Sequence, residues 1–217
     1  FGSVTSEADS FEILDRAVEA GIDFIDTANQ YGGSAGVGAT EFVLGRWLAA
    51  RPGHRDRIVL ATKVHEPMSD WPNDRGVSAL HIRRACDESL RRLQTDHIDL
   101  YQMHHIDRTA PWEEVWQAME TLVQQGKVTY VGSSNFAGWT IAQANEAARS
   151  RHFMGLVSEQ SLYNLAERTV ELEVLPACAA YGVAMLPWSP LAGGVLGGVL
   201  AGQESGRRAS TAMAERI

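Results

Sequence analysis

Four side chains capable of acid–base chemistry follow three successive apolar runs of the sequence. Asp26 closes the first run, and Tyr31 lies five residues later. Lys63 closes the second run, and His104 closes the third. If these runs are parallel strands of a barrel, their carboxyl ends form one ring, so we expect the four side chains to lie close together.

Together these groups could protonate a carbonyl oxygen while negative charge develops on it. A lysine beside Tyr31 is expected to lower the pKa of the phenol, because its positive charge favours the phenolate. Asp26 would keep Lys63 charged and oriented, and His104 would orient or polarise the carbonyl. Tyr31 would then be a general acid. Since none of the four groups can supply a hydride, a reduction would need a cofactor.

Strands and helices are expected to alternate along the chain, because short apolar runs alternate with segments of helical periodicity. The expected strands are 22–26, 57–64, 96–105, 128–132, 155–160 and 183–188, and the expected helices are 10–21, 40–48, 78–93, 112–125, 139–149 and 170–181. The first strand is expected to be buried through Ile22, Phe24 and Ile25. A polar, weakly helical tail is expected from about Gln203.

This alternation predicts an α/β fold with parallel strands and crossover helices. An open nucleotide-binding sheet and a (β/α)8 barrel both fit it. Glycines follow Tyr31 as in a phosphate-binding turn, but their spacing is wrong and the acidic ribose ligand is missing. Polar side chains at nearly every strand end favour the barrel.

The composition is typical of one soluble globular domain over residues 1–217, with 45% hydrophobic and 21% charged residues. The net charge of -8 argues against nucleic acid and anionic membranes as partners. We find no apolar run long enough to span a bilayer and no signal peptide. Cys86 and Cys178 are expected to be buried thiols in a reducing cytoplasm, rather than a disulfide.

Six short motifs, in order along the chain, resemble those of the aldo-keto reductases. They are Asp-Thr-Ala-x-x-Tyr-Gly at 26–32, Ala-Thr-Lys at 61–63, Asp-x-x-Gln-x-His at 99–104, Gly-x-Ser-Asn at 132–135, Gln-x-x-Tyr-Asn at 160–164 and Trp-Ser-Pro-Leu at 188–191. The resemblance implies a (β/α)8 barrel that reduces a small carbonyl compound with NADPH. It makes Tyr31 the proton donor, tuned by Lys63, with Asp26 holding Lys63 and His104 orienting the carbonyl.

The resemblance also implies a cofactor site. Ser134, Asn135 and Gln160 would contact the nicotinamide carboxamide, and Trp188 would stack on the nicotinamide ring. The backbone along Ser189, Pro190, Leu191 and Gly193 would follow the pyrophosphate.

Members of this family are longer than the present chain, which lacks most of the first strand and anything like the eighth. We therefore expect a barrel that is incomplete at both ends in this chain. The basic residues that grip the 2′-phosphate would lie in the eighth unit, so a preference for NADPH over NADH rests on resemblance alone. The substrate and the oligomeric state stay open.

Two alternatives to a general aldehyde, ketone or ketosugar reductase arise from the same motifs. The segments 104–112 and 131–139 are similar to bacterial NDP-hexose 2,3-enoyl reductases of deoxysugar biosynthesis. Potassium-channel β subunits, which hold NADPH while regulating a membrane partner, resemble the chain at Trp-Ser-Pro-Leu. They carry asparagine where this chain has His104, which favours the enzyme.

The pair His104 and His105 invites a metal hypothesis, which we do not favour. Adjacent residues of a strand face opposite ways, so both rings are not expected to bind one ion. The other histidines are expected at surface or packing positions. They are His54, His65, His81, His97 and His152.

Overall fold

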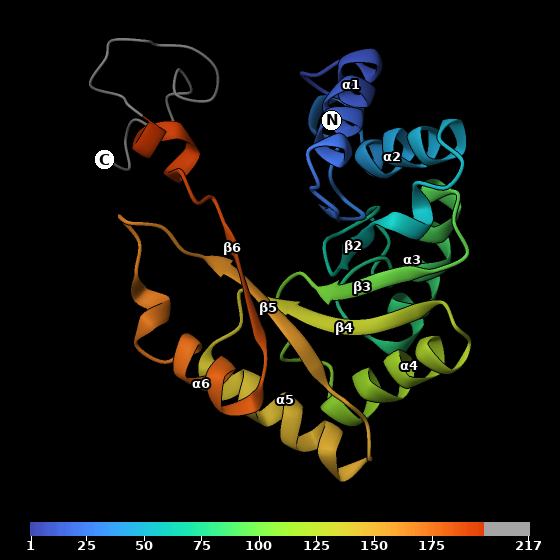
Figure 1. Cartoon of the computed structure of the whole chain (residues 1–217). Helices are drawn as coiled ribbons and strands as arrows, with labels where there is room; N and C mark the ends of the chain where they lie inside the picture. The colour runs from blue at the N-terminus through green and yellow to red at the C-terminus, as the bar shows by residue number, and fades with distance from the viewer. Residues whose placement is uncertain (198–217) are drawn as a thin grey trace.

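Six parallel strands curl as a half-barrel in the computed structural model, which describes residues 1–197 (Figure 1). The predicted tail from about Gln203 lies outside the described residues. The strands are β1 (Phe24–Asp26), β2 (Val59–Val64), β3 (Ile98–Met103), β4 (Val128–Ser134), β5 (Leu156–Leu162) and β6 (Ala184–Trp188). The helices are α1 (Glu7–Glu19), α2 (Ala39–Ala50), α3 (Ala79–Leu93), α4 (Trp112–Gln124), α5 (Gly138–Ser150) and α6 (Val174–Tyr181).

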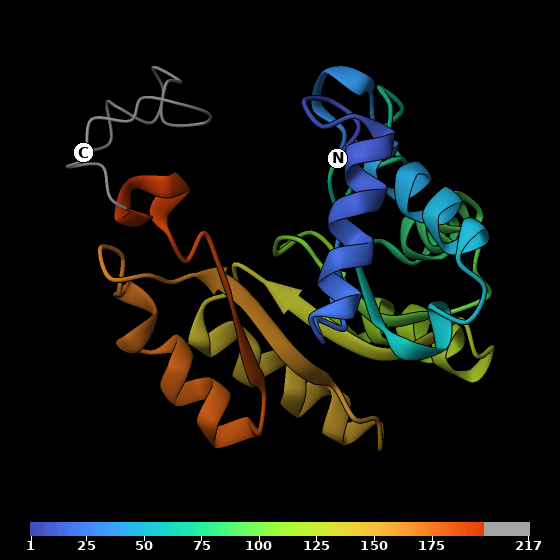
Figure 2. The same ribbon diagram turned by 45° about the horizontal axis from the view of Figure 1, so that its top comes forward.

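The order of strands across the sheet is the order along the chain, β1 to β6. A doubly wound sheet reverses its strand order at a switch point, whereas a barrel adds each strand beside the last. The helices follow the outer side of the curved sheet (Figures 1 and 2). The predicted barrel-type fold is therefore confirmed as a partial (β/α)8 barrel. Within residues 1–197, none of the helices is long and apolar enough to cross a membrane.

Helix α3 shows how the sequence determines where a helix begins and which of its faces is buried. Ser78 caps it by accepting a hydrogen bond from the backbone N–H of His81, as its position predicts. Residues at helical spacing, among them Ile82, Cys86 and Leu93, are fully buried against the sheet and neighbouring helices. Cys86 is thus a buried apolar thiol, as expected.

Two helices begin elsewhere than predicted. Helix α1 begins at Glu7, before the predicted start at Ser10, because Ser6 caps it and its first turn is acidic. Apolar periodicity does not detect such a polar turn. Helix α6 begins only at Val174, after a separate 3₁₀ turn at Thr169–Glu171. The helix begins this late because Pro176 lies in its first turn. Proline has no backbone N–H to bond the fourth residue before it, so a helix tolerates it only there.

The prediction of a buried first strand is wrong except at Ile25. Ile22 is 56% exposed and Phe24 is 37% exposed. Strand β1 has only three residues and lies at an edge of the described sheet. Because burial of an apolar residue depends on what packs beside it, the apolar pattern alone did not reveal this exposure.

A buried polar network joins α2, α3 and β2. Glu41, which is completely buried, accepts hydrogen bonds of 2.6 Å from Thr62 Oγ1 and from Arg92 Nε. The two helices approach closely here, since a Cβ on Gly45 would lie 2.1 Å from the carbonyl oxygen of Arg92. This network fixes the strand that carries Lys63.

Candidate active site

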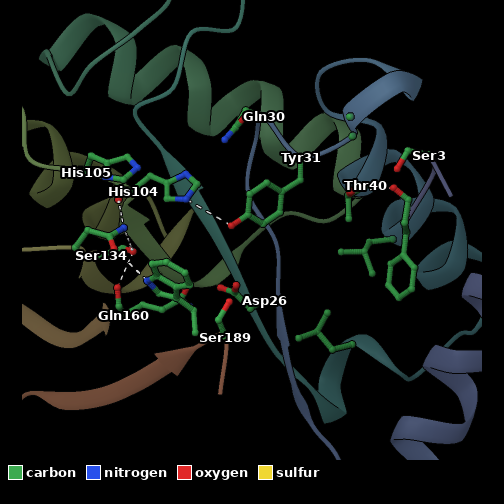
Figure 3. A pocket seen from close by; sticks show the side chains of 17 residues that line it. Ser3, Asp26, Gln30, Tyr31, Thr40, His104, His105, Ser134, Gln160 and Ser189 are labelled. Atoms are coloured by element: carbon green, nitrogen blue, oxygen red, sulfur yellow. Dashed lines mark hydrogen bonds between the residues drawn. The ribbon is translucent and has the colours of Figure 1, made fainter. Parts of the chain in front are cut away.

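A cavity of about 700 Å³ opens at the carboxyl ends of the strands (Figure 3). Most of the predicted site residues line it. They are Asp26, Tyr31, His104, Ser134, Asn135, Gln160, Trp188 and Ser189. Lys63 lies at the strand ends too, and its side chain is completely buried. The fold therefore brings the predicted acid–base groups to one place.

Strand register explains this convergence. Lys63 of β2 pairs with Gln102 of β3, which pairs with Gly132 of β4. Paired residues of neighbouring parallel strands point to the same side, so these positions share one face. A Cβ on Gly132 would lie 3.1 Å from Gln102 Cγ and 2.4 Å from Ser158 Oγ. A glycine is therefore required there for the strands to pack around Gln102.

Asp26 and Lys63 form a close ion pair. Lys63 Nζ lies 2.5 Å from Asp26 Oδ2 and also donates to the carbonyl oxygen of Thr27 at 2.9 Å. Burial lowers the pKa of Lys63, and the charge and hydrogen bond of Asp26 oppose that shift. Asp26 thus favours the charged, oriented ammonium group that the sequence leads us to expect.

Gln102 is a residue of this site that sequence reasoning did not single out. Its Nε2 donates to Asp26 Oδ1 at 2.9 Å, so Asp26 is held by Lys63 and by Gln102. Gln102 is completely buried. The available signal was its place in the Asp-x-x-Gln-x-His motif, two residues before His104.

The phenol of Tyr31 lies between Lys63 and His104. Its hydroxyl oxygen is 3.5 Å from His104 Nε2, and Lys63 Nζ is 5.0 Å from the centre of its ring. The pKa of Tyr31 is raised to about 12, by burial first and then by the negative charges of Asp26 and Glu66. The expectation of a lowered phenol pKa is therefore wrong for this structure, because burial and the two carboxylates raise the pKa.

His104 is held neutral. Burial, and then the positive charge of Lys63, lower its pKa to about 3, with smaller contributions from His105 and His65. The rings of His104 and His105 stack, with centres 5.0 Å apart and planes 11° apart. The expectation that they face opposite ways is wrong, because both follow the last residue of β3, where strand alternation ends.

The other wall of the cavity is a chain of hydrogen bonds from β4 to β6. Asn135 Nδ2 donates to Ser134 Oγ and to the carbonyl oxygen of His104, and Trp188 Nε1 donates to Asn135 Oδ1 at 3.0 Å. Ser134 Oγ in turn donates to the carbonyl oxygen of Gln160 at 2.7 Å. These bonds tie the ring of Trp188 to the strand end that carries His104.

Two of these wall residues have left-handed backbone conformations, with φ 59° at Asn135 and 51° at Ser189. Such conformations are costly outside glycine and gather at binding sites. Beyond Ser189 the chain enters 3₁₀ turns within Ala192–Gly197, which are interrupted at Gly193 and Gly194. The predicted residues Pro190, Leu191 and Gly193 follow Ser189 but are not among the residues that line the cavity.

Comparison with known proteins extends over nearly the whole chain. The model of the Aldo/keto reductase family matches residues 1–212. The chain is 54% identical over 212 residues to the uncharacterized oxidoreductase YrpG of Bacillus subtilis (strain 168). It is 39% identical over 199 residues to norsolorinic acid reductase stcV of Emericella nidulans. It is 35% identical over 204 residues to an aryl-alcohol dehydrogenase (NADP(+)) of Phanerodontia chrysosporium.

These matches cover 96%, 89% and 89% of the present chain but 65%, 50% and 51% of the three relatives. The chain thus spans about half to two thirds of the length of these relatives. None of the three bears the name of an NDP-hexose enoyl reductase or of a channel subunit, so those narrower resemblances gain no support here.

Proposed function

We propose, from the premise that this chain belongs to the aldo/keto reductase family, that it reduces an aldehyde, ketone or ketosugar to an alcohol with NADPH. The observation that carries the proposal is the meeting of Asp26, Lys63, Tyr31 and His104 at one end of the sheet, where Lys63 and His104 are buried and Tyr31 is 36% exposed. Tyr31 Oη and His104 Nε2 lie 3.5 Å apart and face one cavity, so one carbonyl oxygen could accept hydrogen bonds from both.

The protein groups would act as follows. Tyr31 keeps its proton at neutral pH, because its pKa is raised to about 12, and gives it up as negative charge develops on the carbonyl oxygen. Neutral His104, with its proton on Nε2, donates a hydrogen bond that orients the carbonyl. Lys63, held by Asp26, places a positive charge against the tyrosine ring and stabilises the phenolate that remains.

The cavity wall has the chemistry that a nicotinamide cofactor needs. Gln160 lines the cavity, and its side-chain amide forms no hydrogen bond within residues 1–197, so the amide is free to meet a carboxamide. Trp188 is 38% exposed and offers an aromatic face. Ser134, Asn135, Gln160 and Trp188 would hold the nicotinamide, and NADPH would supply the hydride that no side chain can provide.

Support for NADPH comes from one relative, whose name includes NADP(+), and support for carbonyl reduction comes from another, named a reductase. The oxidoreductase names of the relatives favour an enzyme over a regulatory subunit. An NDP-hexose 2,3-enoyl substrate has no such support. A cytoplasmic location accords with the two free, buried cysteines, Cys86 and Cys178.

The test is oxidation of NADPH by the full-length protein with a panel of aldehydes and ketones, beside Tyr31→Phe. We expect the variant to lose at least about a hundredfold in kcat, because it has no proton to donate, while its affinity for NADPH is kept. Tyr130→Phe is the matched control, since Tyr130 of β4 is 46% exposed and does not line the cavity.

Equal turnover by wild type and Tyr31→Phe would contradict the assignment of Tyr31 as the acid. Binding of NADPH without turnover of any carbonyl would favour a protein that only holds the cofactor. Failure to bind NADPH would contradict the proposed cofactor.

A further inference from the structure

One buried amide next to the cavity has no part in the proposed reaction so far. Gln102 of β3 is completely buried and is not among the residues that line the cavity. It therefore does not touch a ligand that is held there. Any influence on the reaction must pass through Asp26, to which Gln102 Nε2 donates a hydrogen bond of 2.9 Å.

Each oxygen of the Asp26 carboxylate has a donor of its own. Oδ2 accepts from Lys63 Nζ at 2.5 Å, and Oδ1 accepts from Gln102. A carboxylate with a single donor can turn about its last side-chain bond, because the torsion there is broad. Since the side chain of Asp26 is 28% exposed, water could then draw it away from Lys63. The second donor removes this freedom, so Oδ2 stays directed at Lys63.

The amide of Gln102 can take only one orientation in this place. Turning it over would put its oxygen against Asp26 Oδ1, and two acceptors would then face each other. In the orientation observed, Oε1 is buried and has no hydrogen-bond partner within residues 1–197, which costs stability. Strand pairing holds the stem, because Gln102 is in register with Lys63 on one side and with Gly132 on the other. The amide is thus fixed for one hydrogen bond, the one to Asp26.

The hold on Asp26 affects the charge of Lys63. Burial lowers the pKa of Lys63, and the charge and hydrogen bond of Asp26 oppose that shift. Tyr31 and His104 also lie near Lys63, but both are uncharged at neutral pH, because their pKa values are about 12 and about 3. If Asp26 turns away, burial therefore prevails and Lys63 loses its proton more readily.

We propose that Gln102 is a positioning residue, which holds the carboxylate of Asp26 on Lys63 and so keeps Lys63 charged beside Tyr31. A charged lysine stabilises the phenolate that the reaction leaves on Tyr31, so Gln102 acts on the chemical step and not on binding. This inference rests on the proposed function, because that function makes Tyr31 the acid. The charge of Lys63, however, can be measured without any turnover.

The kinetic test compares Gln102→Met with wild type in the NADPH-dependent reduction of a carbonyl compound that wild type turns over. Methionine keeps the length of the side chain but donates no hydrogen bond. We expect kcat to fall at least about tenfold, as for the loss of one hydrogen bond to a charged group, with KM and the affinity for NADPH kept. An unchanged kcat, or a change in KM alone, would overturn the inference.

Asn145→Leu is the matched control for a general loss of stability. Asn145 of α5 is also a buried amide with one hydrogen bond, which its Oδ1 accepts from the backbone N–H of Leu156. Its Nδ2 has no partner within residues 1–197. Leu156 begins β5, at the end of the sheet opposite the cavity, so this variant should lose stability but keep kcat. Equal losses of kcat in both variants would reduce the role of Gln102 to a structural one.

Gln102→Glu separates the hydrogen bond from the shape of the side chain, and it serves as well if Gln102→Met does not fold. A protonated glutamic acid donates to Asp26 as the amide does, whereas an ionised one repels it. Its kcat, relative to wild type at the same pH, should rise at least about fivefold as the pH is lowered from about 9 to about 5.5. A ratio that does not vary with pH would contradict the proposal.

Lysine NMR measures the same role without turnover. The chain has two lysines, Lys63 and Lys127, and Lys127 pairs with Asp87 at the surface. The signals of their ε-carbons would be titrated in the cofactor-free full-length protein. Gln102→Met should lower the pKa of Lys63 by about one unit and leave that of Lys127 unchanged. An unchanged Lys63 would refute the inference, whereas a lowered pKa in a protein that reduces no carbonyl would refute only the proposed function.

Discussion

His104 is kept neutral by its surroundings, which lower the pKa of its imidazole to about 3. Its side chain is buried, and Lys63, His105 and His65 all disfavour a positive charge on it. Tyr31 faces the same ring. Such a histidine links folding to pH, because the unfolded chain binds a proton there at a pH at which the folded chain does not.

We expect the cofactor-free protein to lose stability on acidification through His104. The folded pKa of about 3 lies below the ordinary value of 6.5, so the stabilisation is present above pH 6.5 and is lost as the pH falls toward 3. Between pH 7.5 and pH 5 this contribution amounts to about 2 kcal/mol. Urea unfolding of wild type and His104→Gln at both pH values would measure it.

The variant His104→Gln should lose correspondingly less stability than wild type over this range. His152→Gln is the control, because His152 is an exposed histidine outside the cavity, and it should behave as wild type does. Equal losses in wild type and His104→Gln would contradict a histidine held neutral by burial.

At the scale of elements, Glu159 joins the end of β4 to β5. It is completely buried and accepts hydrogen bonds from the backbone N–H of Phe136 and from the hydroxyls of Ser133 and Ser161. Burial raises its pKa, and these hydrogen bonds oppose the shift. Ser133 and Phe136 lie on either side of Ser134 and Asn135, so Glu159 supports the wall that these two residues form without itself lining the cavity.

Removing this carboxylate should destabilise the fold. Glu159→Ala leaves three buried donors without their acceptor, and we expect the free energy of unfolding to fall by about 3 kcal/mol. Denaturant unfolding measures this. Glu12→Ala removes a carboxylate that is 63% exposed in α1 and pairs with Arg16, and it should change stability by less than about 1 kcal/mol. Similar losses in the two variants would refute the structural role of Glu159.

At the scale of the whole molecule, the strands differ in how completely they are paired. Strands β3 and β4 have hydrogen-bonded neighbours on both sides, whereas β1 and β6 lie at the edges of the described sheet. Figures 1 and 2 show the central strands backed by helices of the outer layer. Local opening is easiest where pairing and burial are least.

Hydrogen exchange of the 217-residue chain should therefore be slowest in the middle of the sheet. We expect amides of Leu100 to Met103 in β3 and of Tyr130 to Ser133 in β4 to exchange at least about tenfold more slowly than amides of β1 and β6, a difference of roughly 1.4 kcal/mol in opening free energy. Mass spectrometry of exchanged peptides would measure this. Equal protection of β1 and β3 would contradict the edge position of β1.

The sequence by itself determined the alternation of strands and helices, and with it the positions of Asp26, Lys63 and His104 at or next to the ends of β1, β2 and β3. Periodicity is a local property, so the residue pattern alone predicted the helix that carries Cys86 and identified Cys86 as a buried thiol. The order of the motifs likewise indicated the family.

Only the tertiary structure decided which distant groups meet and how buried they are. Gln102 holds Asp26 across 76 positions of sequence, and Arg92 reaches Glu41 across 51. The raised pKa of Tyr31 follows from burial and from the carboxylates of Asp26 and of Glu66, which is 35 positions away in the sequence. Electrostatic and packing energies depend on distances through space, and spacing along a chain does not specify them.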